Sequence, residues 1–451
     1  MNESTKRPLL FSGSDLKKLI IPLVLEQALA ITVGMADTMM ISGVGEAAVS
    51  GVSLVDMFNG LIIAVLSAMA TGGAVVTSQY LGAEREDAAC RTSKQLIVSA
   101  LAITIVLSAF VMWQNRSIVS LFFGKIDADV FENASLYLLL SALSFPFLAV
   151  YNAAAALFRA MNRSGVTLKV SILMNLINVA GNAIGIYILH AGVAGVAIPS
   201  LISRAVAGII LYLLLRDQSL EVHLDRDRFR VDWDVVRKIF YIGIPSGIEN
   251  GIFQLGRVLV VSIIATFGTA QIAANGVANS LDAMGCISGQ AMNLAMITVI
   301  GRCVGAHDEG QVRYYTRKLL VIAYALQFVC CGTILVFLNP ILRLYGLGAE
   351  ATRLSWILVM IHDGMAILLW PMAFTFPNML RSCNDVRFTM GISIFSMFMF
   401  RIVLSLIIGT MWGYGAIGVW IAMVVDWIFR ILCFVWRYRS GVWKKTAGLV
   451  S

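Results

Sequence analysis

Twelve long apolar stretches follow one another along the chain, and they constrain the fold more than any other feature. Each can supply the ~20 residues with which an α-helix crosses a bilayer. They lie near residues 19–43, 50–80, 93–114, 134–158, 166–190, 193–215, 239–266, 271–301, 317–338, 353–379, 388–410 and 413–436. Membrane-barrel strands are shorter and alternate polar with apolar residues. We therefore expect an all-α polytopic membrane protein with twelve transmembrane helices.

The composition excludes several classes of protein. Hydrophobic residues make up 59% of the chain and charged residues 13%, whereas an average soluble protein is roughly a quarter charged. This excludes a disordered chain, a nucleic-acid-binding domain and an ordinary cytosolic enzyme. No nucleotide-binding G-x-x-x-x-G-K-[ST], metalloprotease H-E-x-x-H or hydrolase G-x-S-x-G motif occurs. We expect no enzymatic activity, no cofactor and an ion gradient as the energy source.

Cysteine and histidine give no sign of a covalent or metal framework. The seven cysteines are scattered and lack C-x-x-C spacing, which argues against disulfides. The four histidines are too dispersed in the sequence to predict a metal cluster. Beyond Na⁺, we expect no bound metal.

The distribution of positive charge predicts the orientation. Of the 34 lysines and arginines, four fall within spans and four in the loops of one side, which leaves 26 on the other side. Positive residues concentrate on the cytoplasmic side of membrane proteins. We expect both termini in the cytoplasm, in the plasma (inner) membrane.

An internal repeat relates the two halves of the chain. One constant shift in residue number, the repeat shift, carries Pro22 onto Pro245 and Glu26 onto Glu249, and late in the repeat Gly192 onto Gly415. An even number of spans in each half makes the repeats parallel. We expect two pseudo-symmetric six-helix lobes, residues 1–215 and 239–451, joined by a polar cytoplasmic linker at residues 216–238. A duplicated scaffold without transport activity is the alternative.

Two acids in the first span are candidates for ion or substrate binding. Glu26 and Asp37 stand eleven residues apart, about three turns, and so share a helix face. A charged group near the bilayer centre costs about 2.5–3.5 kcal/mol on insertion scales, so both should face the interior. We expect Asp37 to be the titrating group of a cation or proton site. The alternative for each is an ion pair that only supports helix packing.

Polar residues also recur in later spans. Asn175, Asn178 and Asn182 form one stripe in the fifth span, suited to cation coordination or to hydrogen bonds between helices. In the second half, Glu249-Asn250 and Asp363 suggest a substrate or second cation site. Asp56, Asp282 and Asp426 are acids of second rank, because they could lie at the membrane interfaces. Arg257 and Arg401 are candidates to pair with the acids.

Together these landmarks resemble the MATE (multidrug and toxic compound extrusion) family of antiporters. The resemblance covers most of the chain and rests on Pro22, Ala36-Asp37-Thr38, Gly45, residues 79–83, Phe158-Arg159-Ala160, Asn178-x-x-x-Asn182, residues 192–197, Gly243-Ile244-Pro245, Val304-Gly305-Ala306, Leu380-Arg381 and residues 415–419. It implies two six-helix lobes around a central cleft. It also implies export of organic cations or drugs in exchange for H⁺ or Na⁺.

The resemblance also assigns residues. The family's first-lobe acid maps onto Asp37, its fifth-span amide onto Asn178 and its sixth-span hydroxyl onto Ser200. Asn182 stands where many members have a second acid. The second-lobe acids fall on Phe253 and Trp370, although Glu249 and Asp363 lie one and two turns away.

We expect a monomer that carries small cationic or amphipathic substrates and binds no nucleic acid. The main alternative is a flippase of a lipid-linked oligosaccharide or another lipid, whose cleft should be rich in cations. A membrane enzyme or receptor is a third possibility, which the missing catalytic motifs disfavour.

Overall fold

The computed structural model of the protein describes residues 8–124, 126–224 and 230–450. Parts of the predicted N-terminal segment (1–7) and linker (225–229), together with Lys125 of a predicted outside loop, lie outside these ranges. Twelve of the described helical segments are long and apolar enough to cross a membrane. The predicted all-α fold with twelve spans is confirmed.

Among the described residues, the first lobe has eight helical segments. They are α1 (Gly13–Ser42), α2 (Glu46–Gly82), α3 (Glu86–Trp113), α4 (Asn115–Phe123), α5 (Ala128–Ala160), α6 (Ser164–Ala183), the π-helical η1 (Ile184–Ile188) and α7 (Ala194–Leu214). Ser12 caps α1 in a capping box with Asp15, which fixes where the first span begins. A buried apolar core, centred on α2 and α5, holds the lobe together.

The second lobe repeats this order with more interruptions. It consists of α8 (Trp233–Ala265), α9 (Thr269–Gly285), α10 (Ile287–Gly305), α11 (Glu309–Val336), α12 (Leu338–Leu344), α13 (Ala349–Trp370), η2 (Pro371–Thr375), α14 (Pro377–Ser382), α15 (Val386–Ser396), η3 (Met397–Val403), η4 (Leu406–Met411), α16 (Gly415–Arg439) and α17 (Val442–Thr446). The predicted boundaries of the lobes and the linker stay a prediction.

The predicted continuous span at 271–301 is wrong in one respect, because the helix breaks at Cys286 between α9 and α10. The carbonyl of Gly285 accepts a hydrogen bond from Gln327 Nε2 of α11 at 3.1 Å. A side chain that donates a hydrogen bond to a backbone carbonyl competes with the helical i→i−4 hydrogen bond at that turn. Such competition is one recognised cause of a helix break.

The backbone conformation also shows the internal repeat. Left-handed or otherwise positive φ angles recur at equivalent positions in the two lobes: Gly45 and Gly268 (135° and 102°), Glu84 and His307 (56° and 52°), Asn162 and Asn384 (60° and 64°), and Gly192 and Gly415 (58° and 57°). The shift that relates Asn162 to Asn384 is one position shorter than the shift that relates Gly192 to Gly415. Between these positions the second lobe has two π-helical segments where the first has one, and a π-helical turn accommodates an extra residue.

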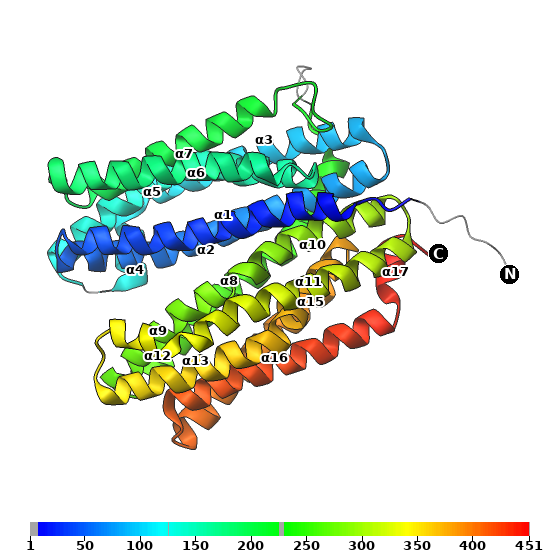
Figure 1. The fold of residues 1–451 in the computed structure, drawn as a ribbon. Coiled ribbons are helices and arrows are strands. Elements are labelled where there is room, and N and C mark those ends of the chain that lie inside the picture. The colour runs from blue at the N-terminus through cyan, green and yellow to red at the C-terminus, as the bar shows by residue number, and fades with distance from the viewer. Residues whose placement is uncertain (1–7, 125, 225–229, 451) are drawn as a thin grey trace.

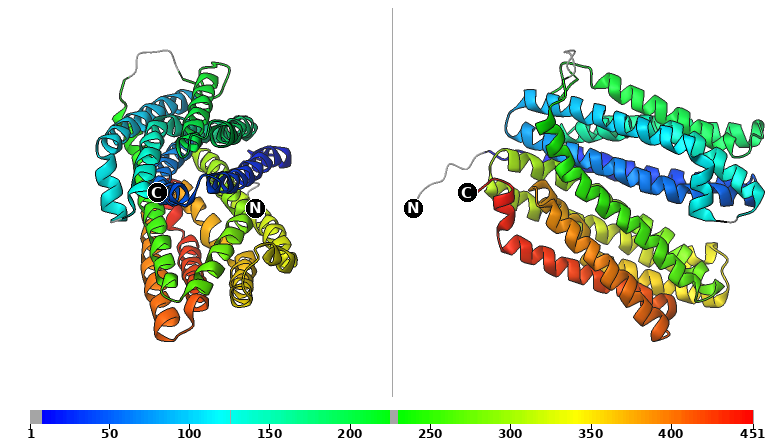
Figure 2. Two further views of the ribbon diagram at one scale, coloured as in Figure 1. Left: turned by 90° about the vertical axis from the view of Figure 1, so that its left-hand side faces the viewer. Right: turned by 180° about the vertical axis from the view of Figure 1, so that it is seen from behind.

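The two lobes pack against each other at the end of the molecule that carries both termini, and the ribbons diverge toward the other end (Figures 1 and 2). Across the interface α2 lies beside α8, and α1 lies beside α10. In the described part of the chain, the hydrogen bonds that join the lobes also lie at this end. Examples are Gln79 Nε2 to the carbonyl of Ser382 at 2.9 Å and Phe11 N to the hydroxyl of Tyr315 at 2.9 Å.

A close approach between the lobes depends on two equivalent glycines. A Cβ added at Gly82 would lie 2.0 Å from the carbonyl oxygen of Arg302, and one at Gly305 would lie 1.9 Å from that of Gln79. The repeat shift relates Gly82 to Gly305 and Gln79 to Arg302. The ends of α2 and α10 therefore meet across the pseudo-symmetry axis, where only glycine lets the backbones touch.

Candidate transport site

A cavity of about 490 Å³ lies inside the first lobe, between α1, α2, α5, α6 and α7. Its polar lining includes Glu26, Asp37, Asp56, Arg204, Gln27, Asn175, Asn178, Ser200 and Tyr137. Ionised groups at this depth must meet water, a counter-ion or hydrogen-bond donors, because hydrocarbon supplies none of them. The cavity therefore brings Glu26, Asp37, Asn178 and Ser200 together around one polar space.

Asp37 of α1 faces two amides of α6. Asn182 Nδ2 donates to Asp37 Oδ1 at 2.8 Å. In the amide orientation that satisfies both of its neighbours, Asn178 Nδ2 donates to the same oxygen at 2.9 Å, and its Oδ1 accepts from Ser200 Oγ at 2.9 Å. Asn182 Oδ1 is buried and has no partner among the described residues. The structure thus brings together the four residues predicted for ion coupling, and their role stays a prediction.

Asp56 belongs to the same cavity, although it ranks second among the acids predicted from the sequence. It accepts a long hydrogen bond from Asn59 Nδ2 at 3.4 Å, and Tyr137 of α5 lies against it. Only residues 43–45 separate α1 from α2, so Asp37 and Asp56 both lie within about three turns of the same connection. The short connection between the first two spans is visible in the sequence, and it could have predicted that Asp56 lies near Asp37.

Arg204 of α7 is the cation of the cavity wall, and sequence reasoning missed it as a site residue. Its Nη1 donates to Ser144 Oγ of α5 at 2.7 Å. No carboxylate of the described residues lies within 4.0 Å of its guanidinium nitrogens. The lining holds this arginine and three acids, of which Glu26 pairs with Arg159, so Asp37 and Asp56 leave the cavity wall with an excess of one acid.

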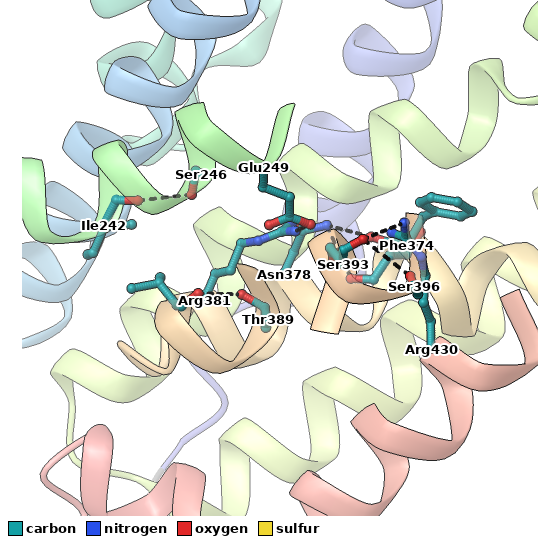
Figure 3. A network of polar contacts seen from close by, with 12 residues as sticks. Ile242, Ser246, Glu249, Phe374, Asn378, Arg381, Thr389, Ser393, Ser396 and Arg430 are labelled. Atoms are coloured by element: carbon teal, nitrogen blue, oxygen red, sulfur yellow. Dashed lines mark hydrogen bonds and ion pairs between the residues drawn. The ribbon is translucent and has the colours of Figure 1, made fainter. Parts of the chain in front are cut away.

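Glu26 and Glu249 each pair with an arginine of their own lobe. Arg159 Nη1 lies 3.6 Å from Glu26 Oε1, and Thr167 Oγ1 donates to the other oxygen at 3.1 Å. In the second lobe, Arg381 extends from α14 to Glu249 and donates at 2.6 Å (Figure 3). The two pairs occupy equivalent places in the repeat. Whether Glu26 and Glu249 also bind a substrate or an ion stays a prediction.

The remaining second-lobe candidates lie apart from Glu249. Asn250 is exposed, whereas Asp363 is fully buried on α13. Both imidazole nitrogens of His362 contact acids: Nδ1 lies 2.8 Å from Asp363 Oδ1, and Nε2 lies 2.8 Å from Asp282 Oδ1. Glu249 and Asp363 therefore belong to separate polar clusters, each with its own partners.

Cys286 also reaches the histidine cluster, and its thiol donates to Asp282 Oδ1 at 3.2 Å. One ligand atom each from Asp282, Cys286 and His362 lies within 4.8 Å of the others. The dispersal of histidines along the sequence could not reveal this grouping, because it joins α9 to α13. The three groups are held by hydrogen bonds to one another.

Three arginines of the second lobe differ in how well they are paired. Arg430 Nε donates to Asp426 Oδ1 at 3.0 Å. Arg401 lies 4.0 Å from the other oxygen of Asp426. Arg257 does not form the predicted ion pair, since no acid of the described chain lies within 4.0 Å of it. Among the described residues, one carboxylate thus serves two of these arginines and the third has no ion-pair partner.

The comparisons with known proteins fit this architecture. The family model MatE matches residues 22–184 and residues 245–407. The chain belongs to the MatE family. The two matched segments are related by the same repeat shift that carries Pro22 onto Pro245. Membership makes this MatE chain a multi-pass membrane transporter and not an enzyme, as predicted.

Relatives span nearly the full length of this MatE chain. An uncharacterised transporter, YisQ of Bacillus subtilis, is 26% identical and the match covers 94% of this chain and 93% of the relative. A probable multidrug resistance protein NorM of Thermotoga maritima is 24% identical over 96% of this chain and 94% of its own. A solved outward-facing multidrug resistance MATE transporter is 20% identical with a TM-score of 0.87, covering 96% of both chains, and shares the fold.

Proposed function

We propose that this MatE protein is a secondary active multidrug efflux antiporter that exports organic cations or drugs in exchange for H⁺ or Na⁺. The observation that carries the proposal is the placement of Asp37, with its amide and hydroxyl neighbours, in the wall of the acidic first-lobe cavity. Several relatives are named multidrug resistance or export proteins, which supports the same activity.

Asp37 can link ion binding to cargo release because one carboxylate cannot serve two cations well. Its Oδ1 accepts an amide hydrogen bond from α6, while Asn182 Oδ1 lacks a partner among the described residues. A proton on Asp37 would be a donor available to a neighbouring oxygen, and Na⁺ would attract oxygen ligands of this kind. Either ion would weaken the attraction of the cavity for a cationic drug and so favour its release.

The way in which the lobes pack supports alternating access. If the excess of positive charge marks the cytoplasmic side, both termini lie in the cytoplasm and the structure is closed on that side. The lobes would then be open toward the outside, ready to release cargo and to admit the ion. Binding of the ion would shift the equilibrium toward the inward-open state. We place the protein in the plasma (inner) membrane, as a monomer.

The test is counterflow of ethidium in proteoliposomes under separate proton and sodium gradients. We expect one gradient to drive ethidium accumulation and an uncoupler of that gradient to abolish it. Ethidium movement that ignores both gradients would contradict coupled antiport. The lipid flippase alternative requires a cation-rich cavity, whereas the first-lobe cavity holds three acids and one arginine. Preferential binding of an anionic lipid by the purified protein would reverse this choice.

A further inference from the structure

A second, smaller cavity of about 50 Å³ lies in the second lobe, between α8, α9, η3 and α16. Its lining consists of Arg257, Val260, Val261, Asn275, Asn279, Arg401, Val419, Trp420 and Met423. A water molecule occupies about 30 Å³ in the liquid, so the cavity has room for a small head group and not for a whole drug. Nothing in the proposed antiport mechanism uses it.

This cavity is the repeat equivalent of the Asp37 site. The repeat shift carries Val52 onto Asn275, Val196 onto Val419 and Ser200 onto Met423, and each of these six residues lines the cavity of its own lobe. The same helices therefore form a pocket at the same place in both lobes. The correspondence comes from the fold and the repeat together, independently of the charges.

The charges at the two equivalent sites are opposite. At the same shift, Val260 takes the place of Asp37 and Asn279 that of Asp56, so both acids are missing. Arg257 takes the place of Gly34. Arg401 takes the place of Asn178 in the register that holds at Gly415. A site that is acidic in the first lobe is thus basic in the second.

The positive charge at this site is only partly neutralised by the described part of the protein, since Asp426 pairs with Arg401 and Asp282 interacts with both arginines at longer range. Arg257 is exposed on α8, eight residues before the helix ends at Ala265, and has no ion pair among the described residues. Arg401 pairs there only with Asp426, at 4.0 Å, and Arg430 binds that carboxylate more closely at 3.0 Å. Asp282, the acid that interacts with Arg257 at longer range, is held by His362 at 2.8 Å.

Neutral donors complete the lining. The indole N–H of Trp420 donates to Asn275 Oδ1 at 3.1 Å, which leaves the amide nitrogen of Asn275 as a donor. Two guanidinium groups with an amide N–H suit a carboxylate, because planar forks of donors match its two oxygens. An exposed cation inside a membrane protein also needs a functional explanation, since placing it there costs free energy.

We propose that the second-lobe cavity, named here the Arg257–Arg401 pocket, binds the carboxylate of an amphoteric cargo whose cationic group faces the acidic first lobe. This rests on the proposed function and specifies its substrate class. The acidic site of the first lobe would bind the cationic group of a zwitterion, and the basic site of the second lobe would bind its carboxylate. Cargo carrying only a positive charge would use the first lobe alone.

The test compares two dyes that differ by one ester. Rhodamine 110 carries a free carboxylate, and rhodamine 123 is its cationic methyl ester. Transport of both is measured in proteoliposomes for the wild type, Arg257→Gln, Arg401→Gln and the control Arg343→Gln, which removes a charge from an exposed position. We expect each pocket variant to lower rhodamine 110 transport about tenfold, the factor that corresponds to about 1.4 kcal/mol. Rhodamine 123 transport should stay within about twofold.

The outcomes separate the two proposals. Wild-type transport of rhodamine 123 without rhodamine 110 would overturn the carboxylate pocket and leave the antiporter intact. An equal loss of both dyes in the pocket variants would also overturn it, as would no loss of either.

If the wild type moves neither dye, the efflux proposal fails for this class of drug. The carboxylate pocket is then tested by the binding of rhodamine 110 to the purified protein. Rhodamine 110 should then raise the melting temperature of the purified wild type but not of Arg257→Gln, and an equal effect on both would overturn the pocket. Arg257→Lys, which keeps the charge, reports whether a loss reflects misfolding, because it should restore part of the binding.

Discussion

Arg381 donates to Glu249 at 2.6 Å, and this contact joins the first helix of the second lobe to the end of its fourth span. The first lobe has the same contact in looser form, with Arg159 lying 3.6 Å from Glu26. Duplication of the chain thus preserved both members of a buried ion pair whose partners come from separate spans. The pair fixes the position of each Pro-containing first helix within its lobe.

The Glu249–Arg381 pair predicts a strong effect on stability. Glu249→Ala leaves a buried guanidinium without its counter-ion, which typically costs about 3–5 kcal/mol. We expect that loss in the free energy of unfolding, measured by SDS titration in mixed micelles. Combining Glu249→Ala with Arg381→Met should recover much of it, because neither charge is then left alone. Glu350→Gln, at an exposed position, is the control. A double variant as unstable as the single would show that the pair is not coupled.

Replacing Asp37 should reduce ion-driven efflux while leaving the protein folded. Asp37→Asn keeps the size of the side chain but removes the charge that we propose binds a cation or proton. We expect ion-driven ethidium efflux to fall at least tenfold at matched expression. Asp87→Asn, which neutralises an exposed acid at the start of α3, should leave efflux unchanged. Gradient-driven efflux at the wild-type rate in Asp37→Asn would remove this residue from the mechanism.

The glycine contact between the lobes predicts a conformational effect. Gly305→Ala would place a methyl group 1.9 Å from the carbonyl oxygen of Gln79, so the lobes could not close at the end that carries the termini. We expect spin labels on α2 and α10 at this end to report longer distances and transport to fall. Gly332→Ala is the matched control, because a Cβ there meets no atom within 4 Å. Unchanged distance distributions in Gly305→Ala would mean that the contact adjusts without opening.

His362 predicts a stability effect of another kind. Its imidazole separates Asp282 from Asp363 with a 2.8 Å contact to each. His362→Phe would leave two acids facing each other without the imidazole contacts, and Asp363 is fully buried. We expect a loss of about 2 kcal/mol or more in unfolding free energy, of the size found for unsatisfied buried polar groups. His362→Phe combined with Asp363→Asn should recover part of the loss. His307→Asn, at an exposed position, should be as stable as the wild type. A His362→Phe variant as stable as the wild type would contradict a stabilising role of the imidazole between the two acids.

The residues around Asp37 can be predicted from the sequence, whereas the arginine partners of Glu26 and Glu249 cannot. Asp37, Asn178, Asn182 and Ser200 can be predicted from the sequence because a carboxylate and an amide stripe stand out in apolar spans, and because they match a family pattern. The ion-pair partners of Glu26 and Glu249 were not identified. Arg159 and Arg381 lie at the ends of other helices, and helix periodicity alone does not say which faces meet.

The sequence by itself determined the number of spans, the duplication and the sign of the charges along each helix. These properties depend on local hydrophobicity and on residue identity, and an apolar segment of about 20 residues must cross the bilayer wherever its neighbours lie. Only the tertiary structure decided which charges meet: Asp56 with the Asp37 cavity, His362 between two acids, and Arg257 beside Arg401 in the pocket equivalent to the acidic one. The rotation and breaks of packed helices set those contacts, and they follow from interactions among residues far apart in the chain.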